Sequence, residues 1–375
     1  MLQLNGAKYA FRGTVAFPLI VLSACHTDQI GGQGKDAGDA ASVVIKMDAA
    51  RDTPADGTAD QKGAGGSLGG APYTFTEFSV PSSDTSPDGI TVGADGNLWF
   101  AGGVVSDTTV GKITTTGTIT LYSSYRFGGT HCIARGPDGN VWYTDDLDSY
   151  VGKVTPSGDF TEFPVPNTTG DQQSFPTGIV LGPDGNLWVS DRFNVLSSIT
   201  PSGTFNGYLA AKTSYGLAGI VVGPDNNLWV KEDDGNSIAR ITPSGTLTEF
   251  RVPKPTDYTF WEDGPNDITL GPDGNLWFTE GNGNRIGRIT PSGTITEFAI
   301  PTADSSPNSI AKGPDGNLWF TECRASQLAR ITPAGTITEY AVPTAKSCPS
   351  GIVAGPDGAI WFTEYSANKI GRMAL

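Results

Sequence analysis

The chain has 375 residues, including 50 Gly and 26 Pro, and only 17% of its residues are charged. This turn-rich composition is typical of a globular protein built from short strands. The formal net charge of −15, without a cluster of Lys and Arg, argues against a nucleic-acid partner, and two His in the whole chain exclude a His-rich metal site.

Residues 1–24 are predicted to be a lipoprotein signal peptide. Lys8 and Arg12 lead into an apolar run, 13–24, that is too short to span a bilayer. The run ends in Leu22-Ser23-Ala24-Cys25, which resembles the bacterial lipobox, so Cys25 is predicted to carry a lipid. An ordinary cleaved signal with an incidental Cys is the alternative. The predicted location is extracytoplasmic, in the periplasm or at the cell surface, with a membrane anchor.

Residues 25–72 are predicted to be a disordered tether between this anchor and the folded domain. The segment is rich in Gly, Ala and Asp and has almost no aromatic residues. Such a segment buries too little apolar surface to offset the entropy of ordering it.

A repeat occupies residues 73–375. The phrase G-x-D-x-N/A-L/V/I-W occurs seven times, with its Trp at 99, 142, 188, 229, 277, 319 and 361. The repeat period is about 42 residues, and one unit, such as 307–343, contains four short strand patterns joined by the turns GPDGN and PSG or PAG. The fold class is therefore all-β, a seven-bladed β-propeller of four-stranded blades.

The two ends of the repeat region are complementary. The last unit stops at residue 375, where a TITEF-like strand should begin, and residues 73–80 supply a spare strand of this kind. We expect the N-terminal strand 73–80 to join the C-terminal blade and close the ring, which removes exposed sheet edges.

The loops that follow W-F-T-E and the connections between blades lie on one face and vary most among the copies. Function on a rigid scaffold is usually placed on such loops. The longest connection, 251–267, carries Tyr258, Phe260 and Trp261, which either form a ligand wall or pack over the channel and the next blade.

An acid stands three residues after the repeat Trp in six units, at Asp145, Asp191, Glu232, Glu280, Glu322 and Glu364. The next strand usually carries a base, at Lys153, Arg240, Arg288, Arg330 and Arg372. We interpret the two sets as cross-strand ion pairs. A ring of carboxylates that holds a divalent cation is the alternative.

Two of the four cysteines lie on the variable face of neighbouring blades. Cys323 follows the second strand of blade six, and Cys348 precedes the first strand of blade seven. In an oxidising compartment we expect these two to form a disulfide. Cys132 is then left as a lone buried thiol.

The repeat resembles that of the virginiamycin B lyase (streptogramin lyase) family over all of 73–375. GPDGNLWFTEGNGNRIGRITPSGTITEF (271–298) carries the resemblance most fully, with W-F-T-E, N-x-I-G-R-I-T and G-x-I-T-E-F. The resemblance implies an elimination that opens the ester bond of a cyclic depsipeptide antibiotic, assisted by Mg, two His and a supporting Glu.

The residues that the resemblance assigns to catalysis differ here. The family's two His stand in the P-H-x-I slots that open blades six and seven, and these slots hold Asn308 and Ser350. The family's Glu two places before the last slot is Cys348, and only Glu364 is approximately retained.

The seven slots, counted along the chain, hold Asp88, His131, Thr177, Ala218, Asn266, Asn308 and Ser350. The slot of blade two thus contains the sole His of the repeat region, with Asp88 in the preceding slot and Asp145 after its own Trp. These three residues form either a small metal or acid–base cluster or a structural hydrogen-bond group.

Three functions are consistent with the sequence. The first is a lipid-anchored propeller that binds a small molecule or an envelope component. The second is a Mg-dependent carbon–oxygen lyase on another ester or glycan-like substrate, with His131 as the base and Asp88, Asp145 or Glu364 holding the metal. The third is an envelope scaffold.

Overall fold

The computed structural model describes residues 43–46, 73–82, 85–102, 108–124, 129–167, 174–210, 216–232, 235–253 and 264–375. The expected signal peptide, Cys25 and the aromatic residues Tyr258, Phe260 and Trp261 lie outside these ranges. None of the described residues form a helix with the length and hydropathy that crossing a membrane requires.

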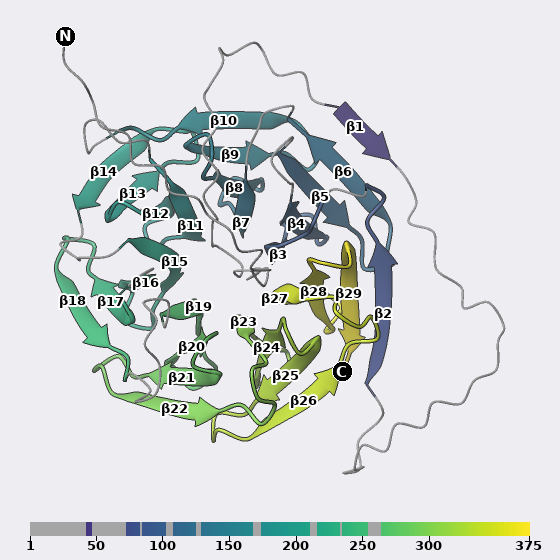
Figure 1. Cartoon of the computed structure of the whole chain (residues 1–375). Coiled ribbons are helices and arrows are strands. Elements are labelled where there is room, and N and C mark those ends of the chain that lie inside the picture. Colours follow the sequence, from purple (N-terminus) through teal and green to yellow (C-terminus); the bar gives the residue numbers. More distant parts are fainter. Residues whose placement is uncertain are drawn as a thin grey trace, which may run out of the picture.

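Seven antiparallel sheets form a ring, with the first strand of each blade nearest the centre, and this confirms the seven-bladed propeller (Figure 1). Blade 1 contains β3 (Ile90–Val92), β4 (Leu98–Gly102), β5 (Thr109–Ile113) and β6 (Ile119–Ser123). Blade 2 contains β7 (Thr130–Arg135), β8 (Val141–Asp145), β9 (Tyr150–Val154) and β10 (Phe160–Pro164). Blade 3 contains β11 (Pro176–Leu181), β12 (Leu187–Asp191), β13 (Val195–Ile199) and β14 (Phe205–Ala210).

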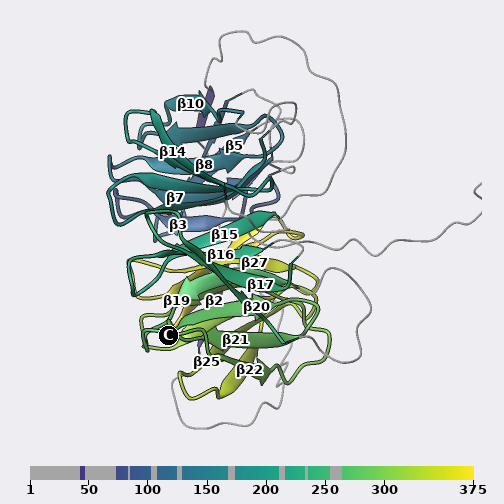
Figure 2. The same ribbon diagram turned by 90° about the vertical axis from the view of Figure 1, so that its left-hand side faces the viewer.

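The remaining blades repeat this order, and Figure 2 shows their sheets from the side of the ring. Blade 4 contains β15 (Leu217–Val222), β16 (Leu228–Glu232), β17 (Ser237–Ile241) and β18 (Leu247–Arg251). Blade 5 contains β19 (Pro265–Leu270), β20 (Leu276–Glu280), β21 (Arg285–Ile289) and β22 (Ile295–Ala299). Blade 6 contains β23 (Pro307–Lys312), β24 (Leu318–Glu322), β25 (Gln327–Ile331) and β26 (Ile337–Ala341).

Blade 7 is built from both ends of the repeat region. It contains β27 (Pro349–Ala354), β28 (Ile360–Glu364), β29 (Lys369–Ala374) and, as its outer strand, β2 (Thr74–Ser79). β2 pairs antiparallel with β29 from Thr74 opposite Ala374 to Ser79 opposite Lys369. The expected closure of the ring is therefore confirmed.

One short strand falls within the segment expected to be a disordered tether. β1 (Val43–Lys46) pairs antiparallel with β6 and gives blade 1 a fifth strand. The rest of the expected tether lies outside the described residues.

The repeat Trp organises the outer half of every blade. Its indole Nε1 donates to the Asp of the preceding GPDGN-type turn at 3.0–3.1 Å in all seven copies. In six blades the indole stacks on an aromatic ring of an outer strand, with ring centroids 5.4–5.8 Å apart. The repeated Trp is thus a structural residue, which the regular spacing implied.

The Lys or Arg of the third strand contacts the repeat Trp and the turn Asp of its own blade. It does not pair with the acid that follows the Trp. Arg288 lies opposite Trp277 in register, over its ring at 5.4 Å, and pairs with the turn carboxylate of Asp273 at 4.0 Å. Glu280 lies at the other end of the strand, opposite Arg285. Lys153, Arg240, Arg330 and Arg372 likewise pair with turn Asp residues. The predicted ion pairs with the acids after the Trp are therefore wrong.

The same bases connect neighbouring blades. Arg288 donates to the carbonyl of Pro333 in blade 6 at 3.0 Å, and Arg240 donates to that of Pro291 in blade 5 at 2.9 Å. Because each base is fixed by its own turn Asp, the blades are joined by short charge-assisted bonds on the face opposite the variable loops.

Phe78 tests the closure, because it is the aromatic partner that β2 supplies to Trp361, at 5.8 Å and an interplanar angle of 11°. It is 6% exposed. We expect Phe78→Ala to lower the free energy of unfolding in urea by about 3–5 kcal/mol, the usual cost of truncating a buried Phe. Thr76→Ser, at an exposed position of the same strand, is the control, with an expected cost below about 1 kcal/mol. Equal effects of the two substitutions would contradict the structural role of the closing strand.

Candidate functional site

The slot residues lie at an irregular point of the innermost strands. In six blades the register of the first strand shifts near the slot, for example between Pro307 and Ile310 in blade 6 and between Thr130 and Ile133 in blade 2. A bulge changes the direction of the side chain it contains. Several slot side chains accordingly contact the neighbouring blade around the mouth of the channel.

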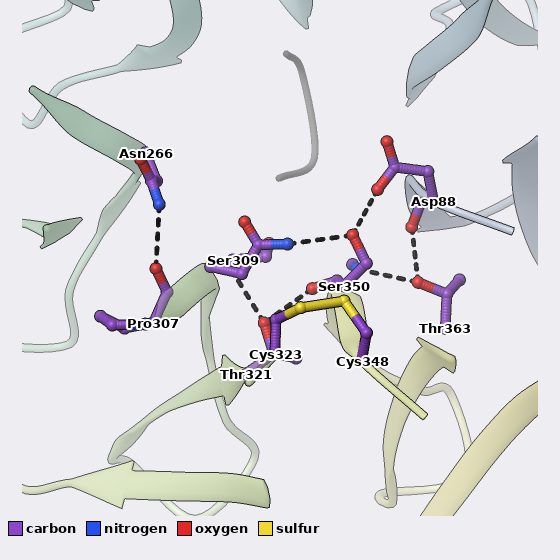
Figure 3. The surroundings of a disulfide bond; sticks show 11 residues. Asp88, Asn266, Pro307, Ser309, Thr321, Cys323, Cys348, Ser350 and Thr363 are labelled. Carbon is purple, nitrogen blue, oxygen red and sulfur yellow. Dashed lines mark hydrogen bonds between the residues drawn. A yellow bond between two sulfur atoms is a disulfide. The ribbon is translucent and has the colours of Figure 1, made fainter. Parts of the chain in front are cut away.

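Four slots form one hydrogen-bonded chain across blades 6, 7, 1 and 2. Asn308 Nδ2 donates to Ser350 Oγ at 3.0 Å, and Ser350 Oγ donates to Asp88 Oδ1 (Figure 3). Asp88 Oδ2 lies 3.0 Å from Nδ1 of His131. Asn308, Ser350 and Asp88 are at most 2% exposed, whereas a quarter of the His131 side chain is exposed. His131 is therefore the end of the chain that meets solvent.

Asp88 joins blade 1 to blade 7 through its backbone as well. Its carbonyl oxygen accepts hydrogen bonds from Thr363 Oγ1 at 2.6 Å and from the amide of Gly351 at 3.1 Å (Figure 3). A Cβ on Gly351 would lie 2.3 Å from that oxygen, so only glycine permits this approach. The Thr of W-F-T also donates to the backbone carbonyl of the slot residue in the next blade elsewhere in the ring. Thr321 Oγ1, for example, donates to the Ser350 carbonyl oxygen at 2.7 Å.

Burial alone would lower the pKa of His131, but the hydrogen bond to Asp88 and the charges of Asp88, Asp146 and Asp145 raise it overall above its ordinary value. The imidazolium is the form that these carboxylates stabilise. A general base must be unprotonated at the working pH. This environment therefore favours a histidine that holds a proton over one that removes one.

The carboxylates that were predicted to hold a metal, Asp88, Asp145 and Glu364, do not point toward one common position. Asp145 accepts hydrogen bonds from Thr108 Oγ1 and from the amide of Asp148, both at 3.1 Å, and burial raises its pKa to about 7. Glu364 follows Thr363 on β28, and successive side chains of a strand point to opposite faces. Since Thr363 contacts Asp88, Glu364 faces away from it.

No three His, Cys, Asp or Glu side chains of the described residues are arranged to hold a metal ion. The donors at the two assigned slots, an amide and a hydroxyl, bond each other. The described residues therefore do not fit the Mg site that the family resemblance implies.

The other acids after the repeat Trp are buried groups with individual surroundings. Burial and then the charge of Glu339 raise the pKa of Glu322 to about 8, while burial and then Glu249 raise that of Glu232 to about 7. Burial and then Glu77 raise the pKa of Glu364 to about 7. Carboxyl groups with such pKa values retain protons near neutral pH, which does not favour the cation-binding ring.

A disulfide links blades 6 and 7 at the mouth of the channel. Cys323 and Cys348 form a disulfide, with Cα atoms 3.9 Å apart, and both residues are at most 7% exposed. Figure 3 shows this disulfide. Its Cys348 stands at the position where the resemblance places the family's supporting Glu. Cys132 is also disulfide-bonded, so the expectation of a lone thiol there is wrong.

One acidic residue of the channel was missed. Asp267 follows the slot of blade 5 and accepts hydrogen bonds from Ser309 Oγ at 2.6 Å and from the amide of Ile310 at 3.0 Å. It lines a central cavity of about 280 Å³ to which the inner strands of all seven blades contribute. The sequence already indicated that Asp267 is unusual, because the six equivalent positions in the other blades hold uncharged Gly, Cys or Ser.

The fold and the mouth define a seven-bladed propeller whose inner bulges carry its variable polar residues. The profile of the virginiamycin B lyase family matches residues 70–191 and 169–375, and the chain belongs to this family. No curated protein matches the chain.

Solved structures of this family are similar to the chain over the propeller. A streptogramin B lyase is 34% identical with a TM-score of 0.73, over 81% of this chain and 98% of its own. A catalytically inactive His-to-Ala variant of virginiamycin B lyase from Staphylococcus aureus, with quinupristin, is 36% identical with the same TM-score, over 81% of this chain and all of its own. A selenomethionine form of that enzyme is 35% identical with equal coverage and TM-score.

The buried Glu322 carboxyl predicts a contribution to stability that is larger in acid than in mild alkali. The pKa of Glu322 is about 8 in the folded protein against 4.5 for the ordinary group. Its contribution to stability is therefore fully present below about pH 4.5 and is lost as the pH rises through about 8. We expect Glu322→Gln to raise the free energy of unfolding at pH 8.5 by on the order of 1–3 kcal/mol and to change it little at pH 4.5.

The measurement is urea unfolding followed by tryptophan fluorescence at both pH values. Asp304→Asn, at an exposed carboxylate of blade 6, is the control and should leave the pH dependence unchanged. A Glu322→Gln protein that is equally or less stable than wild type at pH 8.5 would show that this carboxyl is ionised in the folded state.

Proposed function

We propose that this chain is an extracytoplasmic ligand-binding propeller of the virginiamycin B lyase family that does not open streptogramins. The observation that carries the proposal is which residues occupy the two slots that the resemblance assigns to catalytic His. Asn308 and Ser350 occupy them and are buried; Asn308 donates a hydrogen bond to Ser350, and Ser350 donates one to Asp88. The ligand would be a small molecule or an envelope component at the variable face.

The chemistry of elimination supports this proposal. Removing a proton next to a carbonyl requires a base whose pKa lies near the working pH, together with a group that stabilises the enolate. The amide of Asn308 is not a base at neutral pH. The Ser350 hydroxyl donates a hydrogen bond to the Asp88 carboxylate and is itself not a base at neutral pH. The polar side chains of these slots instead hold neighbouring blades together, which suits a preformed binding surface.

A carbon–oxygen lyase acting with Mg on another ester is the second candidate function. One observation favours it: Asp88 holds Nδ1 of His131, which is the arrangement that orients a catalytic imidazole through its other nitrogen. In this alternative His131 would act at Nε2, and its raised pKa would suit a proton donor better than a base.

Quinupristin tests the proposed absence of streptogramin opening. We expect the purified full-length protein, incubated with quinupristin with and without Mg²⁺, to yield no linear product by mass spectrometry. Linear product would overturn the proposal. Its loss in His131→Gln, with retention in Glu322→Gln, would then assign the reaction to the blade 2 slot.

We also propose that Cys25 carries the lipid anchor. The four lipobox residues support this, because the lipid would be attached to the Cys25 sulfur as a thioether. The thioether and a Cys25–Cys132 disulfide are alternatives, because Cys25 is the only cysteine other than Cys132 outside the Cys323–Cys348 pair. The mass of the Cys25 peptide therefore also decides between them. The anchor would hold the propeller at a membrane surface outside the cytoplasm.

Expression in a bacterial host tests the anchor. We expect the wild-type protein to fractionate with membranes and to yield an acylated Cys25 peptide by mass spectrometry. Cys25→Ser, which removes the thioether sulfur, should appear in the soluble extracytoplasmic fraction. An unmodified wild-type Cys25, or equal membrane recovery of both proteins, would refute lipidation.

A further inference from the structure

The outer strand of blade 1 is covered by a strand from the segment that precedes the ring. β1 pairs antiparallel with β6, from Val43 opposite Ser123 to Lys46 opposite Thr120. It lies at the rim of the ring, outside β6 (Figure 1). Among the described residues the other six sheets have four strands, so blade 1 alone has a fifth.

The outer strands of the other blades carry features that oppose pairing with a further strand. Five of them have a glutamate at the centre, opposite a Gly or Ala of the third strand: Glu77, Glu162, Glu249, Glu297 and Glu339. In blade 3 the register of β14 shifts, and its Gly207 has a φ of 64°. Charged side chains and bulges are two means by which an edge strand avoids further pairing.

The outer strand of blade 1 has neither feature. Leu121 stands at the position of the glutamates, opposite Gly111, and is 6% exposed. No residue of β6 is charged, and its pairing with β5 runs through five successive residues without a shift. Without β1, this regular and uncharged strand would present a row of unpaired amide and carbonyl groups at its outer edge.

The sequence of β1 suits this edge. The segment 25–72 consists largely of Gly, Ala and Asp, and Val43-Val44-Ile45 is the only place in it where three β-branched aliphatic residues follow one another. Residues of this type favour strands. The one strand-forming run of the segment thus pairs with the one outer strand that lacks both a central glutamate and a bulge.

We propose that the outer edge of β6 is a docking site for Val43–Lys46 of the same chain. The docked strand pairs the backbone groups of this edge and excludes a second copy of the protein from it. Residues 47–73 connect β1 to β2 and so keep the strand at a high effective concentration near its site. Four residues therefore suffice in cis, although a separate peptide of this length would bind weakly. The proposal involves neither the mouth nor its ligand.

The docked strand also shortens the connection to the proposed lipid anchor. Residues 25–42 span at most about 60 Å when fully extended, whereas the whole of 25–72 would span about 160 Å. The rim of the propeller at blade 1 is then held nearer to the membrane than a free segment would hold it. This consequence alone rests on the proposed lipidation of Cys25.

Hydrogen–deuterium exchange of the full-length protein, measured by mass spectrometry, tests the docking. Relative to their intrinsic rates, we expect the amides of 43–46 to exchange at least tenfold more slowly than those of 55–70. Val44→Pro combined with Ile45→Pro should speed exchange in β6 at least tenfold. Successive amides of a strand point to opposite sides, so one of these two must face β6, and proline removes it. Ala49→Pro with Ala50→Pro, outside β1, is the matched control and should change neither rate.

Circular dichroism and unfolding temperature establish that the ring is folded in each variant. If 43–46 exchanges as fast as 55–70 in the wild type, or if exchange in β6 is unchanged in the folded Val44→Pro/Ile45→Pro protein, the docking site is wrong.

Light scattering after size exclusion identifies the source of the strand. We expect a monomer in which the protection of 43–46 does not depend on protein concentration. A dimer whose protection rises with concentration would show that the strand comes from a second copy, and this would overturn docking in cis. These measurements are independent of quinupristin opening and of Cys25 acylation, so a failure of the docking is distinguishable from a failure of the proposed function.

Discussion

Everything at the mouth depends on the pairing of β2 with β29. This pairing joins residues almost 300 positions apart, from Thr74 with Ala374 to Ser79 with Lys369, and so fixes blade 1 against blade 7. Asp88 follows directly from β2 and can meet Ser350, Gly351 and Thr363 only in a closed ring. Loop closure over this length costs entropy, which the buried aromatic contacts and seam hydrogen bonds together offset.

The turn end of each blade carries the repeated structural contacts, and the opposite end carries the residues that vary between blades. At the turn end, the Asp, the Trp and the base form the same contacts in successive blades, for example Asp273, Trp277 and Arg288. At the other end, six of the seven inner strands have a bulge, and several of the slot side chains contact the neighbouring blade. A slot can therefore change from His to Asn or Ser without disturbing the Trp layer, which explains how a family scaffold accommodates different mouths.

The repeat allowed most of the fold to be predicted, because its period, its turns and its missing last strand each have a direct structural meaning. The partners of the bases were not predictable, since the register of strands two and three places Arg288 opposite Trp277 and not opposite Glu280. The chain from Asn308 to His131 depends on bulges that a pattern of apolar residues does not reveal. Asp267 did carry a sequence signal, because it departs from the residue types that its position has in the other blades.

The mouth contains polar side chains that are buried yet ordered. Asn308 and Ser350 occupy the slots that the resemblance assigns to His, and buried donors and acceptors without partners are costly. Asp88 resolves most of this by accepting from Ser350 and by holding His131, so the polar chain runs toward solvent in blade 2. There the chain ends at His131, whose Nδ1 lies 3.0 Å from Asp88 and whose side chain is one quarter exposed. The slots assigned to family catalysis thus contact one another and Asp88 across the seam that closes the ring.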